Sequence, residues 1–176
     1  MTYYYFEGIF LLWNMNKAIE IFKKLLGENV AEAVIELDAP DHPDGHWWID
    51  VRAGKRHFVI EYRPGRGFGV FDEKTEFGEG PAEIYRTPEL VVRRLKQLAA
   101  SRKGKRGPLS LKDLRELYEC SQVDLAKKVG VQQSAISRFE QREEVKLGTL
   151  EAAINALGGR LEIRAHFSDS DVPIAI

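Results

Sequence analysis

Residues 121–140 (SQVDLAKKVGVQQSAISRFE) constrain the fold of this chain more than any other stretch. Ser121 is a favourable helix N-cap. Apolar residues follow it at helical spacing, namely Val123, Leu125, Ala126 and Val129. Gly130 predicts the end of this helix, because glycine tolerates the positive φ of a C-cap. Val131 is expected to lie in the next turn and to point inward, so the segment predicts a short amphipathic helix that ends in a tight turn.

A second helix is predicted directly after the turn, beginning at Gln132 or Gln133. Its buried face is expected to consist of Ala135, Ile136 and Phe139. The outer face would then consist of polar side chains, namely Gln133, Ser134, Ser137 and Arg138. These side-chain types hydrogen-bond base edges in the major groove: glutamine pairs with adenine, arginine with guanine, and serine with either. A helix that is apolar inside and polar outside in this way is typical of a DNA-recognition helix.

The segment resembles the Xre family, the lambda-repressor/Cro-like helix-turn-helix proteins, over about residues 111–167. The matching residues are Ser121-Gln122, Leu125-Ala126, Val129-Gly130-Val131, Gln133-Ser134, Ile136-Ser137, Phe139-Glu140, Leu147-Gly148-Thr149-Leu150 and Ala156-Leu157-Gly158-Gly159-Arg160-Leu161. A helix that stops at Gly-Gly and continues into the sequence RLEIRAHF is similar to the Xre subgroup found as antitoxins of toxin–antitoxin operons. The resemblance implies a sequence-specific DNA-binding repressor that controls its own operon.

Candidate DNA contacts come from the outer face of the motif and its basic margins: Gln122, Lys127, Gln132, Gln133, Ser134, Ser137, Arg138 and Arg142. The resemblance implies that Gln122, at the start of the first helix, contacts backbone phosphate. Lys127, Lys128, Arg142 and the linker cations are expected to add electrostatic contacts. Such domains bind as dimers to half-sites about 34–36 Å apart. Double-stranded DNA and a second copy of the chain are therefore the expected partners.

The segment Arg160–Phe167 is predicted to be a strand, because apolar and charged side chains alternate along it. The apolar set is Leu161, Ile163, Ala165 and Phe167, and the polar set is Glu162, Arg164 and His166. A strand isolated after a helical domain needs a partner edge. The sequence therefore predicts that this strand forms the dimer interface.

Charge is distributed unevenly along a chain whose net charge is −1. Residues 1–100 contain 13 Lys/Arg and 16 Asp/Glu, a net charge of −3, whereas residues 101–167 contain 13 and 9, a net charge of +4. Positive charge is therefore concentrated in the half that contains the motif, as phosphate contact requires.

The remaining residues predict an α+β organisation. The N-terminal half predicts a helix over 16–26 that ends at Gly27, strands over 46–52, 57–62 and 67–71, and a helix from Pro88 to about Ala100. The expected architecture is a small N-terminal α-β-β-β-α domain (15–100), a basic linker (101–108) and an all-α, lambda-repressor-like domain with a C-terminal strand (109–167). Residues 1–14 are interpreted as an upstream extension before a start at Met15; a real strand is the competing interpretation.

Several functions are not expected. The N-terminal half has no recognisable catalytic set, since His46, Asp50 and His57 lack a nucleophile, so an enzyme is not predicted. Four scattered histidines and one cysteine predict neither a metal site nor a cofactor. The single Cys120 fits a reducing cytoplasm, and no apolar run is long enough for a membrane span. The glycines of GRGFGV (65–70) precede a strand, which predicts a tight turn.

Three roles remain open for the whole chain. The first is an autorepressing antitoxin whose N-terminal domain engages a toxin. The second is a small-molecule-responsive repressor with the N-terminal domain as sensor. The third is a protein-interaction module that no longer binds DNA. Trp47 and Trp48 must point to opposite faces of their strand, and an exposed tryptophan there would suit a partner or a ligand.

Overall fold

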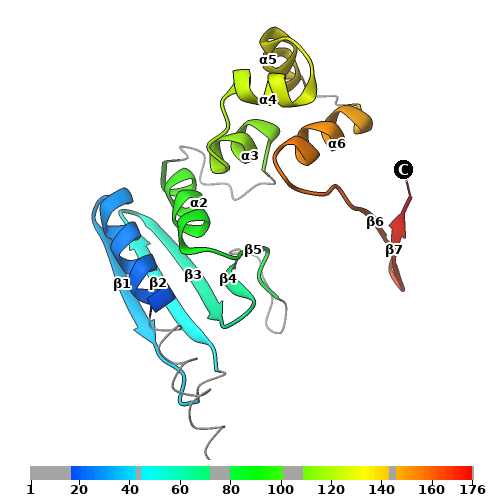
Figure 1. Ribbon diagram of the computed structural model, residues 1–176. Helices are drawn as coiled ribbons and strands as arrows, with labels where there is room; N and C mark the ends of the chain where they lie inside the picture. Colours follow the sequence, from blue (N-terminus) through cyan, green and yellow to red (C-terminus); the bar gives the residue numbers. More distant parts are fainter. Residues whose placement is uncertain (1–16, 43–44, 72–79, 101–108, 143–145, 176) are drawn as a thin grey trace, which may run out of the picture. The chain divides into compact units, whose positions relative to one another are not determined.

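The computed structural model describes residues 17–42, 45–71, 80–100, 109–142 and 146–175 (Figure 1). The chain divides into two compact units, Met1–Gly107 and Pro108–Ile176, called here the N-terminal and C-terminal units. The interpretation of residues 1–14 and the predicted linker 101–108 lie outside the described residues. Among the described residues, no helix has both the length and the apolarity needed to cross a membrane.

The N-terminal unit is an antiparallel sheet with two helices, which confirms the predicted α+β class. A helix over residues 17–29 comes first (blue in Figure 1). The sheet has five strands in the order β1-β2-β3-β4-β5. The strands and the second helix are β1 (Ala33–Asp38), β2 (Trp47–Ala53), β3 (Arg56–Arg63), β4 (Gly67–Val70), β5 (Glu83–Tyr85) and α2 (Pro88–Ala100).

The structure has two edge strands that the sequence did not predict, and its first helix ends later than predicted. A three-stranded meander was predicted, but β1 and β5 extend it to five strands. β5 has only three residues, and β1 has consecutive exposed side chains instead of a clear alternation. The first helix also passes through Gly27, since the Val30 N–H donates to the Leu26 carbonyl at 2.8 Å in the next turn. The prediction that this helix ends at Gly27 is therefore wrong, because the helix continues to residue 29.

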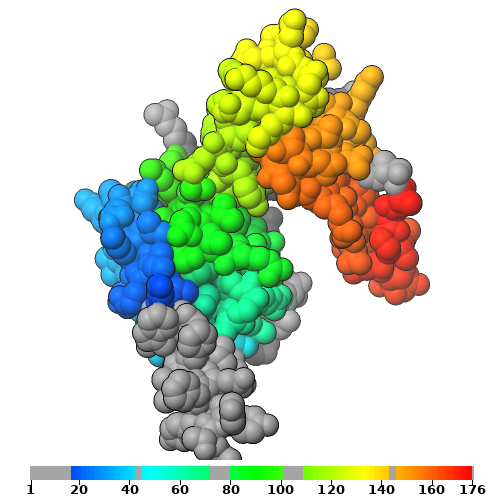
Figure 2. Space-filling view, viewed as in Figure 1, coloured from blue at the N-terminus to red at the C-terminus, as the bar shows by residue number. Residues whose placement is uncertain are grey.

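Both helices of the N-terminal unit pack on the same face of the sheet (Figures 1 and 2). The buried residues of this face are Ile49, Val51, Phe58, Ile60, Phe68 and Val70. Phe22 of the first helix stacks on Phe68 with ring centroids 5.3 Å apart. From α2, Arg94 forms an ion pair with Glu83 of β5 at 2.7 Å. The other face of the sheet has no helix from the described residues.

The C-terminal unit is a set of short helices followed by a hairpin. Its elements are α3 (Leu111–Leu117), α4 (Gln122–Val129), α5 (Gln133–Gln141), α6 (Leu147–Ala156), β6 (Ile163–His166) and β7 (Asp171–Ile174). The helical core consists of Cys120, Leu125, Ala126, Ile136, Phe139 and Ala153. Burial of this apolar set fixes α4 against α5 and α6.

Two valines predicted to face inward are exposed. Val123 is 49% exposed and Val131 is 43% exposed. The inward positions of α4 are Leu125 and Ala126, and the position one turn before Ala126 belongs to Gln122, not to Val123. The Val131 N–H closes the turn by donating to the Ala126 carbonyl at 2.9 Å, which leaves its side chain outside. Ala135 was also predicted to be buried and is only half-buried.

The predicted C-terminal strand already has a partner within the chain. β6 pairs antiparallel with β7, with Ile163 opposite Ile174 and Ala165 opposite Val172. The premise that this strand is isolated is therefore wrong, and its place in the dimer interface stays a prediction. β7 is hard to recognise in the sequence because it contains Pro173, and proline within a sheet is mostly confined to edge strands.

Candidate nucleic-acid interface

The sequence fixes both ends of α4 through local hydrogen bonds. At the N-terminus, the Ser121 Oγ accepts from the Asp124 N–H at 3.0 Å, and the Asp124 carboxylate accepts from the Ser121 N–H at 3.3 Å. This reciprocal capping box satisfies two helix donors, and the hydrogen bonds from Ser121 hold the pKa of Asp124 below its usual value. At the C-terminus, Gly130 adopts the left-handed region, with φ of 78°. The turn into α5 is therefore sharp.

A chain of side-chain hydrogen bonds connects α3, α4 and α5. The Arg115 Nε donates to Glu140 at 2.7 Å, and the Gln122 Nε2 donates to the other Glu140 oxygen at 2.8 Å. The Gln133 Nε2 in turn donates to the Gln122 Oε1 at 2.6 Å. Arg115 also donates to the Cys120 carbonyl at 2.8 Å. We call Arg115, Glu140, Gln122 and Gln133 the polar relay; it runs from the buried side of the unit to the start of α5.

The buried end of the relay is a charged pair. The Glu140 side chain is 4% exposed and the Arg115 side chain is 10% exposed. Burial by itself would raise the pKa of Glu140, but the hydrogen bonds from Arg115 and Gln122 outweigh it and lower the pKa. The hydrogen bond to Glu140 raises the pKa of Arg115. Both groups are therefore ionised near neutral pH, and each fixes the orientation of the other.

The first turns of α5 present exposed polar side chains, of which Gln133 is held by the relay. Gln132 is the N-cap residue and makes no side-chain capping bond, so its amide is available to a ligand. Gln133 and Ser134 are exposed, and Gln133 is held by Gln122. Arg138 is exposed one turn later and donates from Nε to the Ser134 carbonyl at 3.2 Å. These side chains form one polar surface on α5.

The other predicted site residues lie at the margin of this surface. Ser137 is half-buried, in contrast to its expected place on the outer face. Lys127 and Lys128 are exposed in the last turn of α4. Arg142 is exposed at the C-cap of α5.

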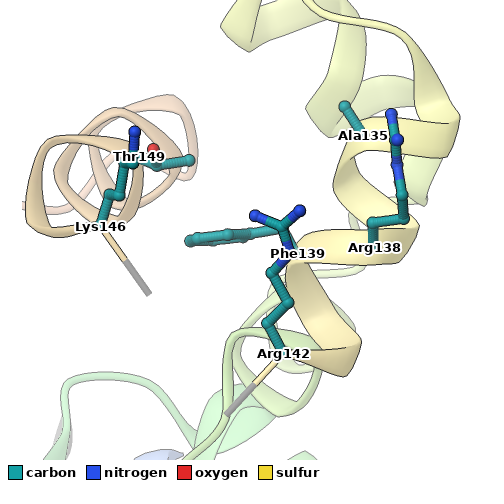
Figure 3. A pocket seen from close by; sticks show the side chains of 6 residues that line it. All are labelled: Ala135, Arg138, Phe139, Arg142, Lys146 and Thr149. Carbon is teal, nitrogen blue, oxygen red and sulfur yellow. The ribbon is translucent and has the colours of Figure 1, made fainter. Parts of the chain in front are cut away.

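An open groove of about 280 Å³ lies between α5 and α6. Its lining residues are Ala135, Arg138, Phe139, Arg142, Lys146 and Thr149 (Figure 3). In Figure 3 the Phe139 ring points from α5 toward the helix that begins beside Lys146. Among the described residues, the lining includes three cations and no carboxylate, which suits an anion such as phosphate. Lys146 and Thr149 were not predicted as site residues from the sequence. The available signal was a lysine directly before the first turn of α6, which could have indicated a phosphate contact.

Elsewhere in the described part of the chain, the other chemistry-bearing residues form no comparable site. Among the residues described, no group of three or more His, Cys, Asp or Glu side chains is placed to hold a metal ion. Asp50 contacts His57 at 2.6 Å, whereas His46 contacts Glu61 at 2.8 Å. The three residues considered as a catalytic group are thus divided between two separate pairs.

A capped helix, a left-handed glycine turn and an exposed polar second helix define a helix-turn-helix domain. Residues 111–163 match the family HTH_3, described as helix-turn-helix. The C-terminal unit therefore contains an Xre-like helix-turn-helix domain. The match covers this part of the chain only.

Relatives of the same segment are described as antitoxins. A protein described as antitoxin HigA3, from Mycobacterium tuberculosis (strain ATCC 25618 / H37Rv), is 38% identical over 60 residues, which are 33% of this chain and 55% of that protein. The chain thus spans about half the length of this curated relative.

Two solved structures are also similar in sequence. "DNA bound antitoxin HigA3" is 33% identical, covering 40% of this chain and 94% of that one, with a TM-score of 0.38. "Induced DNA bending by unique dimerization of HigA antitoxin" is 36% identical, covering 38% and 92%, with a TM-score of 0.36. Both TM-scores are low, so the domain assignment rests on the family match and the helix geometry.

Proposed function

We propose that this chain is a sequence-specific DNA-binding transcriptional regulator that places α5 in the major groove. The observation that supports this proposal most strongly is the polar relay. It links an exposed glutamine at the start of α5 to a buried ion pair, so Gln133 is oriented before any ligand arrives. A preorganised side chain loses less conformational entropy on binding than a free one.

Base contacts are assigned to the polar surface of α5. Gln132 and Gln133 are of the type that pairs with adenine, Arg138 is of the type that pairs with guanine, and Ser134 suits either base. Arg138 has to exchange its hydrogen bond with the Ser134 carbonyl for one with a base. Ser137 is half-buried and so would make a smaller contribution than the sequence predicted.

Phosphate contacts are assigned to both sides of that surface. Gln122, at the first turn of α4, donates one amide hydrogen to Glu140 and is proposed to donate the other to one strand of the backbone, and Lys127 adds charge on the same helix. The cationic groove with Arg142 and Lys146 provides a second anchor beside α5. Binding is expected to weaken as salt rises, because condensed counterions are released when phosphates are neutralised.

The β6–β7 hairpin is proposed as the homodimer interface. Paired residues share a face of the hairpin, and one face has the apolar set Ile163, Ala165, Val172 and Ile174. Val172 is 44% exposed and Ile174 is 49% exposed. A two-stranded hairpin is marginally stable alone in water. Packing the apolar faces of two copies together would stabilise both hairpins.

An autorepressing antitoxin is the most specific form of this proposal. It is supported by the likeness of the helix-turn-helix segment to a protein described as an antitoxin. In that role residues 15–100 form a domain that engages the toxin, and the basic segment 101–108 connects it to the DNA-binding domain 109–167. A repressor with a small-molecule sensor in the N-terminal unit is the alternative. Finding a toxin gene next to the gene for this chain would favour the antitoxin over the sensor.

The test is binding of the full-length chain to the DNA upstream of its own gene, measured by fluorescence anisotropy against scrambled DNA of equal length. We expect tighter binding to the upstream DNA, with an affinity that falls steeply with salt. Lys146→Gln should weaken binding to both DNAs equally, whereas Arg138→Ala should reduce the difference between them. Equal affinity of the unaltered chain for both DNAs would contradict sequence-specific regulation.

A further inference from the structure

The face of the N-terminal sheet opposite its two helices has a composition that points to a partner. Side chains alternate between the two faces of a strand. Ile49 and Val51 are buried under the helices, so Trp48 and Asp50 point to the opposite face, called here the open face. The strand register places Asp38 opposite Trp48 and Glu36 opposite Asp50 on this face.

The centre of the open face is aromatic. Trp48 is 39% exposed, and its ring centroid lies 5.4 Å from that of Phe71 at the end of β4. Pro81 limits the open face on the β4 side, because a Cβ added to Gly69 would lie 2.6 Å from the proline Cγ. The accessible part of the face is therefore centred on β1 and β2, around Trp48.

Carboxylates surround this tryptophan. Glu36 pairs with Arg52 at 3.1 Å, Asp50 contacts His57 at 2.6 Å, and Glu61 pairs with Arg63 at 2.7 Å. Asp38 is exposed beside Trp48. Glu61 is buried, so its ion pair with Arg63 adds no net charge to the surface. Because histidine is charged only when protonated, the remaining carboxylates Glu36, Asp38 and Asp50 face one permanent cation, Arg52. The surface around Trp48 is thus net negative.

We propose that the open face docks an arginine- or lysine-bearing segment of a partner protein. A guanidinium or ammonium group stacks on the face of a tryptophan and is drawn there by the ring quadrupole. Asp38, opposite Trp48 on β1, and Asp50, two residues along β2, then accept hydrogen bonds from the same cations. The inference concerns the N-terminal unit alone and does not depend on DNA binding by the C-terminal unit.

The same charges argue against two other occupants. Nucleic acid would place phosphates against Asp38, Asp50 and Glu36, which repel them. A second copy would present an identical acidic face, and like charges across an interface cost binding energy. A cationic protein segment is the occupant whose charge complements this surface.

The experiment titrates the full-length chain with the acetylated peptide Arg-Leu-Arg-Leu-Arg-Leu, using isothermal titration calorimetry. Trp48→Leu preserves an apolar side chain and removes the ring, and Asp38→Asn removes one charge. Each should weaken peptide binding by about two- to five-fold, as expected for an exposed cation–π contact or ion pair. Together they should weaken it about ten-fold if they act independently. Glu28→Gln is the matched control on the first helix, and it should leave peptide binding unchanged.

Three results would overturn the proposal. The first is equal peptide affinity of the unaltered chain and the Trp48→Leu/Asp38→Asn variant. The second is equal binding of the matched peptide Glu-Leu-Glu-Leu-Glu-Leu. The third is a dimer that dissociates on Trp48→Leu, which would assign the face to a second copy. Anisotropy with the upstream DNA is measured on the same variants; retained DNA binding with lost peptide binding separates this inference from the proposed function.

Discussion

The side-chain amide of Gln133 donates a hydrogen bond of 2.6 Å to the side-chain oxygen of Gln122, and so joins the first residue of α5 to the first residue of α4. The side chains of these two glutamines, eleven residues apart in the sequence, therefore lie side by side at the start of the two helices. Gln122 is itself held by the buried Glu140. Orientation of the proposed base-contacting residue therefore depends on Gln122 and on the buried carboxylate behind it.

A double-mutant cycle tests this coupling. Gln133→Ala should weaken binding to the upstream DNA by about 1–3 kcal/mol. Gln122→Ala should also weaken it, but the double variant should lose less than the sum of the two, with an interaction energy of about 0.5–1.5 kcal/mol. Gln132→Ala serves as the control, because the hydrogen bonds of the Gln122 side chain go to Glu140 and Gln133, and its effect should be additive with that of Gln122→Ala. Additive effects of Gln122→Ala and Gln133→Ala would show that the hydrogen bond does not matter for binding.

The relay also predicts an acid-sensitive C-terminal unit. The folded-state pKa of Glu140 is lowered, so its stabilisation is present above the unfolded-state value of about 4.3 and is lost as pH falls through the folded-state pKa. The lowered pKa of Asp124 acts in the same direction. Urea unfolding followed by far-ultraviolet circular dichroism should therefore show a less stable helical unit below about pH 4.

Removing the carboxylate at neutral pH gives a complementary test. Glu140→Ala leaves the largely buried Arg115 with only the more distant carboxylate of Glu116, at 3.9 Å, and should cost up to about 3–5 kcal/mol. All three tryptophans lie in residues 1–107, so tryptophan fluorescence separately follows the N-terminal unit and should not change. Glu151→Gln, an exposed carboxylate on α6, is the matched control. If Glu140→Ala proved no less stable than Glu151→Gln, the buried pair would not stabilise the unit.

Two aspartate substitutions distinguish the inner and outer sides of the motif. Ile136 is 3% exposed, so Ile136→Asp buries an unpaired charge and should unfold the C-terminal unit. Val123 is half exposed near the N-terminus of α4, so Val123→Asp should change stability by no more than about 0.5 kcal/mol. Thermal unfolding followed by circular dichroism compares them directly. An unfolded Val123→Asp protein together with a folded Ile136→Asp protein would reverse the faces assigned to the two helices.

Much of the helix-turn-helix could be predicted from the sequence, because its signals are local. Ser121 and Gly130 fix the ends of α4, and Leu125, Ala126, Ile136 and Phe139 repeat at helical spacing. The relay could not be predicted, because Arg115 and Glu140 are 25 residues apart and meet only after three helices pack. Val123 was wrongly predicted to face inward for the same reason. Gln122 takes the inward position instead, because the buried carboxylate of Glu140 accepts its hydrogen bond.

The dimer proposal is tested on the apolar face of the hairpin. Val172→Asp combined with Ile174→Asp places two charges in the proposed contact and should give monomers in analytical ultracentrifugation, because unpaired charges resist burial. Arg164→Gln, on the opposite face, is the control and should leave the dimer intact. A dimer that persists in the double variant would locate the interface outside the hairpin.

Sequence-specific recognition by α5 is tested most directly by selecting DNA from a random pool with the full-length chain and with Arg138→Ala. The unaltered chain should select one preferred sequence, and Arg138→Ala should lose the preference for guanine at one position in each half-site while it retains the others. The expected loss of discrimination is about 1–3 kcal/mol at that position. Selection of the same sequence by both proteins, or of no preferred sequence by the unaltered chain, would contradict the assignment of α5 as the recognition helix.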